Sequence, residues 1–279
     1  MNNELLSQQI DKKVAQASTS TTMGQGVALN PLMASNSPIL ESSKTEVVLV
    51  GRFAPDELHP KKLLEAKVLT EAEVQRATIN ALLPGQIVDF ALDWVTVQVV
   101  AQRTAFVSSQ APYVRIADLA LKTVREIMRA PAITMLGINR EFNFTFTSTE
   151  ARDTFGSRLA PPEAWGAWGK SVRNEFSNQL NSGKHGGLIA IQMRQAAPDD
   201  REAGWIDVTV GSSSNAASPL GVVVRVNDHY QTSESADPQS LSKDGHEASR
   251  TSRLLDALFN SFDESVHRSD AIAHELVML

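Results

Sequence analysis

Residues 133–147 constrain the fold of this chain more than any other segment, because their side chains alternate between apolar and polar. Alternation with a period of two predicts a β-strand with one buried face and one solvent-facing face. The apolar parity holds one isoleucine and three phenylalanines, namely Ile138, Phe142, Phe144 and Phe146. Arg140 shares that parity, so we expect it to be paired, to lie at the end of the sheet, or to be shifted by a bulge near Gly137.

Two longer segments have the apolar spacing of amphipathic helices. Apolar residues recur every three or four positions over residues 113–129 and again from Leu254 towards the C-terminus. Two Thr-x-x-Glu sequences, which begin at Thr70 and Thr147, are capping boxes and predict the starts of further helices. The first should open a helix that extends to Leu82.

Trp165 and Trp168 lie within four residues, at the start of another segment with helical spacing. Two neighbouring indole rings can form a platform on which a ligand stacks. Packing of such a pair against a sheet is the commoner role, and we expect it here.

Further β-rich runs predict strands over residues 46–53, 187–196, 205–211 and 219–231. Residues 87–107 are too long for one ordinary strand and predict two antiparallel strands with a turn at residues 101–104. These elements together predict an α+β fold, in which helices pack on one face of an antiparallel sheet.

The first 44 residues are rich in Ser, Thr, Gln and Asn, so residues 1–44 are predicted to be a disordered N-terminal tail. Residues 45–279 should form a single α+β domain. A short echo between residues 138–142 and 226–230, both apolar-Asn-polar-polar-aromatic, raises the alternative of two pseudo-symmetric lobes, 45–147 and 148–279.

Composition excludes several kinds of chemistry. The chain has no cysteine, which removes disulfides, thiolate metal sites and cysteine nucleophiles. Its formal net charge of −6 does not favour nucleic acid or anionic lipid as a partner. The N-terminus lacks the features of a signal peptide, and no apolar run reaches the ~18 residues that span a bilayer. We therefore expect a cytoplasmic protein without a membrane segment or a cofactor.

The strand predicted at 219–231 supplies the best polar constellation. Arg225, Asn227 and His229 share one face of that strand, and Asn139 and Glu141 share the polar face of the strand at 133–147. The five residues could bind a small polar ligand, with His229 as a base if Asp228 or Glu141 oriented it. An ordinary solvent-facing sheet surface explains the same pattern, and we favour that explanation.

A metal site is not predicted. His267, Asp270 and His274 can share a helix face, and imidazole and carboxylate groups suit zinc or iron. The two histidines, however, lie two helical turns apart, ~10 Å along the axis, which is too far for one ion.

We therefore expect an interaction or binding protein without a catalytic centre of its own. It would act through sheet edges, the C-terminal helix and the flexible tail, and would bind a protein partner or form a homo-oligomer. A first alternative is a sensor or enzyme with a small-molecule site between the two lobes. A second is nucleic-acid binding through the helix at 113–129, although Asp118 and Glu126 dilute its basic face.

Overall fold

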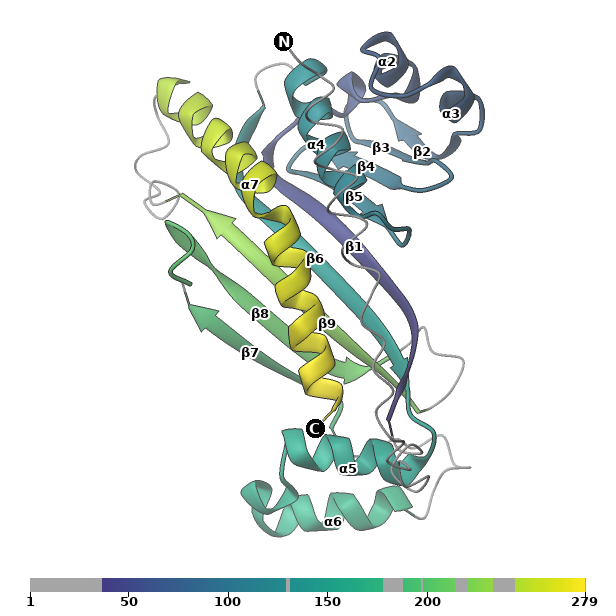
Figure 1. The fold of residues 1–279 in the computed structure, drawn as a ribbon, viewed down its shortest axis with the longest axis vertical. Helices are drawn as coiled ribbons and strands as arrows, with labels where there is room; N and C mark the ends of the chain where they lie inside the picture. Colours follow the sequence, from purple (N-terminus) through teal and green to yellow (C-terminus); the bar gives the residue numbers. More distant parts are fainter. Residues whose placement is uncertain are drawn as a thin grey trace, which may run out of the picture. The chain divides into compact units, whose positions relative to one another are not determined.

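Within the described residues, nine antiparallel strands form one sheet in the order β2-β3-β4-β5-β1-β6-β9-β8-β7 (Figure 1). The computed structural model describes residues 37–128, 131–177, 188–196, 198–213, 220–232 and 244–278. The strands are β1 (Ile39–Arg52), β2 (Thr78–Leu83), β3 (Ile87–Ala91), β4 (Thr96–Val100), β5 (Arg103–Ser108), β6 (Ala132–Thr145), β7 (Ala190–Ala196), β8 (Ala203–Ser212) and β9 (Gly221–Gln231).

Helices cover one face of this sheet. The longest, α7 (Asp244–Val277), lies along β6 and β9, and α4 (Val114–Glu126) lies beside α7 and contacts β1 and β5 (Figure 1). The remaining helices are η1 (Pro55–Glu57), α2 (Pro60–Glu65), α3 (Glu71–Gln75), α5 (Thr149–Leu159), η2 (Pro162–Trp165) and α6 (Gly166–Ser177). The predicted α+β fold is therefore confirmed. None of the described helices is long and apolar enough to cross a bilayer.

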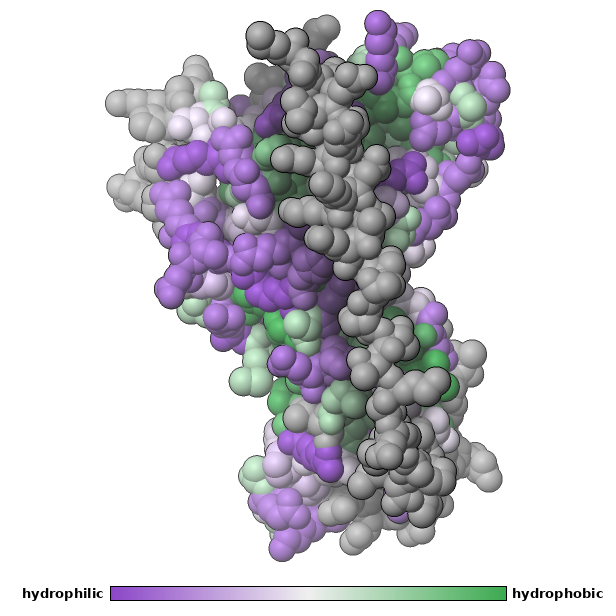
Figure 2. All heavy atoms as spheres, in the orientation of Figure 1, coloured by the Kyte–Doolittle hydropathy of each residue, from purple (hydrophilic) through white to green (hydrophobic). Residues whose placement is uncertain are grey.

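The apolar stripe of α7 is buried against the sheet along most of its length. Leu254, Leu258 and Phe262 belong to a core cluster with residues of β1, β3–β6 and α4, and Ala273 and Val277 belong to a second cluster with residues of β6, β8 and β9. Burial of each large apolar side chain stabilises the fold by roughly 1.5–3 kcal/mol. The side of α7 turned to the viewer in Figure 2 is mostly hydrophilic.

The predicted strand at 133–147 is confirmed as β6, and its apolar parity faces the helices. Ile138 is fully buried, and the phenylalanines of the same parity are 4–7% exposed. The polar residues on the other face of β6 are less exposed than predicted, because Glu141 and Asn143 are only 8% and 4% exposed. Neighbouring polar side chains on β1 and β9 cover them, so this part of the opposite face is not the open solvent-facing surface that we predicted.

The helix predicted over residues 70–82 is shorter than expected. Thr70 caps α3, and the reciprocal hydrogen bonds with Glu73 complete the predicted capping box. Beyond Arg76, however, the chain forms β2, which pairs with β3 through a turn at Gly85, where φ is 71°. Pairing with a neighbouring strand therefore outweighs the local helical spacing.

Residues 87–107 form three strands rather than the predicted two. A turn at Ala101–Gln102 separates β4 from β5, as expected. A second turn precedes β4, where the Leu92 amide donates to the Val95 carbonyl at 2.8 Å and Ser108 Oγ donates to the Trp94 carbonyl at 2.6 Å. The Ser108 side chain, which belongs to another strand, thus stabilises a turn that the local sequence did not indicate.

The first described strand, β1, begins at Ile39, six residues before the predicted start of the domain at residue 45; residues 1–36 lie outside the described residues. The sheet also runs across the predicted lobe boundary at residue 147. β6 pairs with β9 from Met135 to Thr145, six strands precede the boundary and three follow it. The two halves therefore share one sheet and differ in topology, instead of forming separate pseudo-symmetric lobes.

Candidate functional site

The five predicted site residues lie together on the sheet face opposite α7. β6 and β9 are antiparallel neighbours, so Asn139 lies directly across from Asn227 and Glu141 directly across from Arg225. His229 lies across from Gly137, one step further along the same face. The structure thus brings together two segments that are distant in the sequence.

Charges on this face are neutralised by their neighbours. Glu141 accepts a hydrogen bond of 2.7 Å from Arg225 and forms an ion pair of 3.1 Å with Lys44 on β1. Burial alone would raise the pKa of Glu141, but the hydrogen bonds from Arg225 and Lys44 outweigh it and hold that pKa below its ordinary value. Glu141 is therefore a charged structural partner and not a proton donor at neutral pH.

The five predicted site residues form a polar row across β6 and β9, and further polar residues extend this row over five strands. Glu46 on β1 lies opposite Asn139, and Asp207 on β8 lies opposite Asn227. Arg194 on β7 closes the row with two hydrogen bonds to Asp207, of 2.7 and 2.6 Å, which lower the pKa of that carboxyl. Sequence reasoning missed these members, because their position depends on strand register, although their parity within each strand was visible.

His229 is held in a stack and not in a catalytic arrangement. Its ring lies over Trp205, with centroids 4.0 Å apart and planes at 16°. Burial lowers its pKa, so the imidazole is neutral at physiological pH. Asp228 points to the opposite face and Glu141 is bound to Arg225 and Lys44, so neither orients His229 as the base hypothesis required.

Three atoms at the centre of the row have no hydrogen-bond partner among the described residues: Asn139 Oδ1, Asn227 Oδ1 and His229 Nε2. Both amide oxygens face the space above Gly137, where a Cβ would lie 3.3 and 3.5 Å from them. All three atoms are enclosed by their neighbours. The row is best described as a packed polar ladder.

On the helix-covered face, charged residues fix α7 to the central strands. Asp228, fully buried, accepts hydrogen bonds from Arg201 and Arg268, the latter at 2.9 Å. Arg140 donates to Asp270 at 2.6 Å and to the Thr45 hydroxyl at 2.6 Å. Of the three arrangements expected for Arg140, pairing is therefore the one that occurs, and Asp270 is engaged as its partner.

Small residues allow α7 to approach the sheet between these two ion pairs. Ser265, Ser269 and Ala273 follow each other at intervals of four and are at most 1% exposed. Arg268 and Asp270 flank Ser269, so each reaches the opposite charge on the strand beneath it. The ion pairs consequently specify the position of α7 along β6 and β9.

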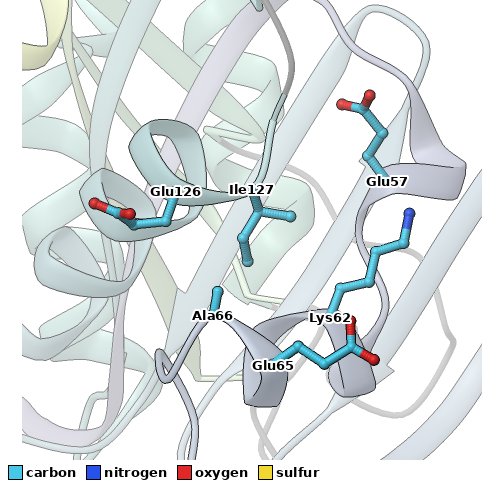
Figure 3. Close-up of a pocket in the computed structure, with 6 residues that line it drawn as sticks. All are labelled: Glu57, Lys62, Glu65, Ala66, Glu126 and Ile127. Atoms are coloured by element: carbon cyan, nitrogen blue, oxygen red, sulfur yellow. The ribbon is translucent and has the colours of Figure 1, made fainter.

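Figure 3 shows a hollow near α2 and the end of α4, with a volume of about 400 Å³. It is lined by Glu57, Lys62, Glu65, Ala66, Glu126 and Ile127. The three carboxylates point in different directions (Figure 3), and Lys62 Nζ donates to the Asp56 carbonyl at 2.8 Å. The side chains do not converge on one ligand position, so we assign no binding role to this hollow.

The two outer strands of the sheet differ in regularity. β2 has a register shift between Ile79 and Ala81, which is the kind of irregularity that protects an exposed edge. β7 pairs with β8 from Ala190 to Ala196 without any shift. On its other side no described strand pairs with β7, and most of its side chains are exposed, including Met193 at 73%.

Two other surfaces were considered from the sequence: the tryptophan pair after α5 and the basic face of α4. Trp165 and Trp168 are 59% and 65% exposed and contact each other, with centroids 5.9 Å apart, so the expected packing against a sheet is wrong. On α4, Arg115 stacks over Trp94 at 4.0 Å and Arg125 lies 3.9 Å from Asp256. Nucleic-acid binding through this helix remains a prediction.

The structure is that of an α+β protein whose sheet has one face covered by helices and one polar face. No model of a known protein family matches the chain, and no curated protein matches its sequence. Its function therefore has to be argued from its own surfaces.

Proposed function

We propose that this protein recognises another polypeptide by strand addition to the β7 edge. Strand addition uses the unpaired backbone groups of an edge strand for affinity and alternate side chains for selectivity. The single observation that carries the proposal is the long, unshifted and exposed edge of β7, where Ile189 and Met193 are 74% and 73% exposed.

β7 lacks the features that usually keep an edge strand from pairing. Proline, lysine, a bulge or an inward-pointing charge are the common protective devices. The sequence of β7, Ala-Ile-Gln-Met-Arg-Gln-Ala, contains one charged residue, Arg194. Its guanidinium is bound to Asp207 and lies 4.4 Å over the Trp205 ring, so it is directed back across the sheet instead of along the edge.

The other surfaces that the sequence offered for protein binding are less suitable. Most of the apolar stripe of α7 is buried in the core of the same chain, although Phe259 is 68% exposed. The predicted tail lies mostly outside the described residues. Among sheet edges, β2 is irregular. β7 is consequently the surface that best fits a binding protein.

Site-specific photocrosslinking in the native cells tests the proposal. Benzoylphenylalanine at Gln195 should give a discrete adduct, whereas the same probe at Leu82 on β2 should not, because only β7 offers a regular edge. A Met193→Lys substitution in the Gln195 probe variant should reduce the yield of the adduct several-fold, since an edge charge opposes strand pairing. Equal adducts at both edges, or none at Gln195, would overturn the proposal.

A further inference from the structure

We infer that the strand added to β7 is β7 of a second copy of this chain, so that two sheets join across a two-fold axis. This inference rests on the proposed function of the β7 edge. A two-fold interface requires that one surface be complementary to itself, because each residue meets a residue of the same surface. β7 meets that requirement when the axis passes through Met193.

Antiparallel pairing around Met193 overlaps the whole strand. Met193 lies opposite its own counterpart, Gln192 opposite Arg194 of the second copy, and Ala190 opposite Ala196. Every residue then faces one of the same parity, so the polar faces of both sheets stay on one side and the helix-covered faces on the other.

Charge and polarity support this register. Gln192 and Arg194 lie on the polar face of β7, so this register places the neutral carboxamide of Gln192 opposite Arg194 of the second copy and leaves each Arg194 paired with its own Asp207. A shift of the axis to Arg194 would place two arginines directly opposite each other, which is unfavourable. On the other face the two Met193 side chains, 73% exposed in the single chain, would cover each other.

The apolar face of β7 also continues an existing core. Ile191 packs against the cluster that contains Ile206, Val210 and Val224. Met193 follows Ile191 on that same face, but the described chain leaves it exposed. A second β7 would therefore extend the core of each copy at the point where it ends.

A single introduced cysteine tests the pairing register, because the natural chain contains none. Facing residues of two antiparallel strands lie about 4.5–5.5 Å apart between Cα atoms, which a disulfide can span. Under mild oxidation, Met193→Cys should become a disulfide-linked dimer, whereas Leu82→Cys, on the opposite edge, should stay monomeric at the same concentration. Equal rates of cross-linking at the two positions would overturn the inference.

A charge exchange at the same position provides a second test. Met193→Lys and Met193→Glu should each weaken self-association by roughly fivefold in analytical ultracentrifugation, because like charges would face each other. An equimolar mixture of the two variants should restore it. A full-length protein that is monomeric at every concentration, or variants that associate as the natural chain does, would overturn the second copy as occupant. A Gln195 photoadduct with a different protein would in that case still support strand addition. The absence of both self-association and any Gln195 photoadduct would overturn both proposals.

Discussion

Arg268 on α7 donates a hydrogen bond of 2.9 Å to Asp228 on β9, and Asp228 is fully buried beneath the helix. Asp228 also accepts from Arg201, whose side chain is 3% exposed. Two guanidinium groups thus share one fully buried carboxylate, and both also pair with Asp200. The ion cluster couples the C-terminal helix to the loop that precedes β8 and to the centre of the sheet.

Removal of the Asp228 charge should be strongly destabilising. Asp228→Asn should lower the free energy of unfolding by about 3 kcal/mol, because it removes the fully buried carboxylate that Arg201 and Arg268 share and leaves the partly exposed Asp200 to pair with both. Asp263→Asn, at an exposed position of the same helix, should change it by less than about 0.5 kcal/mol. Urea denaturation of the two variants measures both values, and equal values would show that the cluster does not fix α7.

Gly204 should not tolerate a side chain. Its φ is 138°, and a Cβ there would lie 2.0 Å from the His229 carbonyl oxygen. Gly204→Ala should therefore lower the free energy of unfolding by more than about 1 kcal/mol. Gly156→Ala is the matched control, since its Cβ would meet only Leu188 at 3.7 Å and alanine favours the helix by roughly 0.5–1 kcal/mol. In thermal denaturation, Gly204→Ala should lower the melting temperature, whereas Gly156→Ala should leave it unchanged or raise it.

The stability of the fold should begin to decrease as pH falls below about 6.5, because burial holds the pKa of His229 below that ordinary value in the folded chain. The unfolded chain then binds a proton that the folded chain does not. His229→Phe keeps a ring against Trp205 and should abolish the change between pH 6.5 and 5. Urea denaturation across this range measures it, and an unchanged slope in the variant would assign the effect to another group.

A second loss of stability should follow at lower pH. The pKa values of Glu141 and Asp207 are both lowered in the folded chain, so these carboxylates stabilise it above their ordinary values of 4.5 and 3.8. That stabilisation should disappear as pH falls below about 4.5 and through the lowered values. Asp207→Asn should reduce the loss in this acid range, as measured by urea denaturation.

Trp165 and Trp168 should contribute little to folding. Because each is mostly exposed, Trp165→Ala or Trp168→Ala should change the free energy of unfolding by about 0.5 kcal/mol or less. Phe155→Ala is the contrasting variant and should cost about 3–5 kcal/mol, since Phe155 is 5% exposed and its ring packs against that of Phe146 with centroids 5.2 Å apart. A large loss at either tryptophan in chemical denaturation would contradict their exposed position.

Local sequence signals predicted much of the fold. The alternation of β6, the apolar stripe of α7 and the capping box at Thr70 each depend on residues a few positions apart, and each was confirmed. β2 was mistaken for helix, because its Thr78, Ala81 and Leu82 continue the helical spacing that begins at Val74. Its pairing with β3, which decides the outcome, is not visible in a single local window.

Strand register explains what was missed at the candidate site. The polar parity of each strand was predicted, but nothing in the sequence aligned Asn139 with Asn227 or brought Asp207 and Arg194 into the same row. These neighbours determine that the row is packed and internally paired. Similarly, the exposure of Met193 follows from the position of β7 at the outside of the sheet, which its own residues do not encode.

Hydrogen exchange of the backbone amides of residues 190–196 tests the central claim, that β7 is an edge for strand pairing, most directly. We predict that the amides of β7 that point away from β8 exchange rapidly in dilute protein and become protected as protein concentration rises, while those of residues 78–83 on β2 do not change. Exchange of residues 190–196 that is fast and independent of concentration would contradict pairing with a second copy. Protection that is equal in β2 and β7 would contradict the distinct role of the β7 edge.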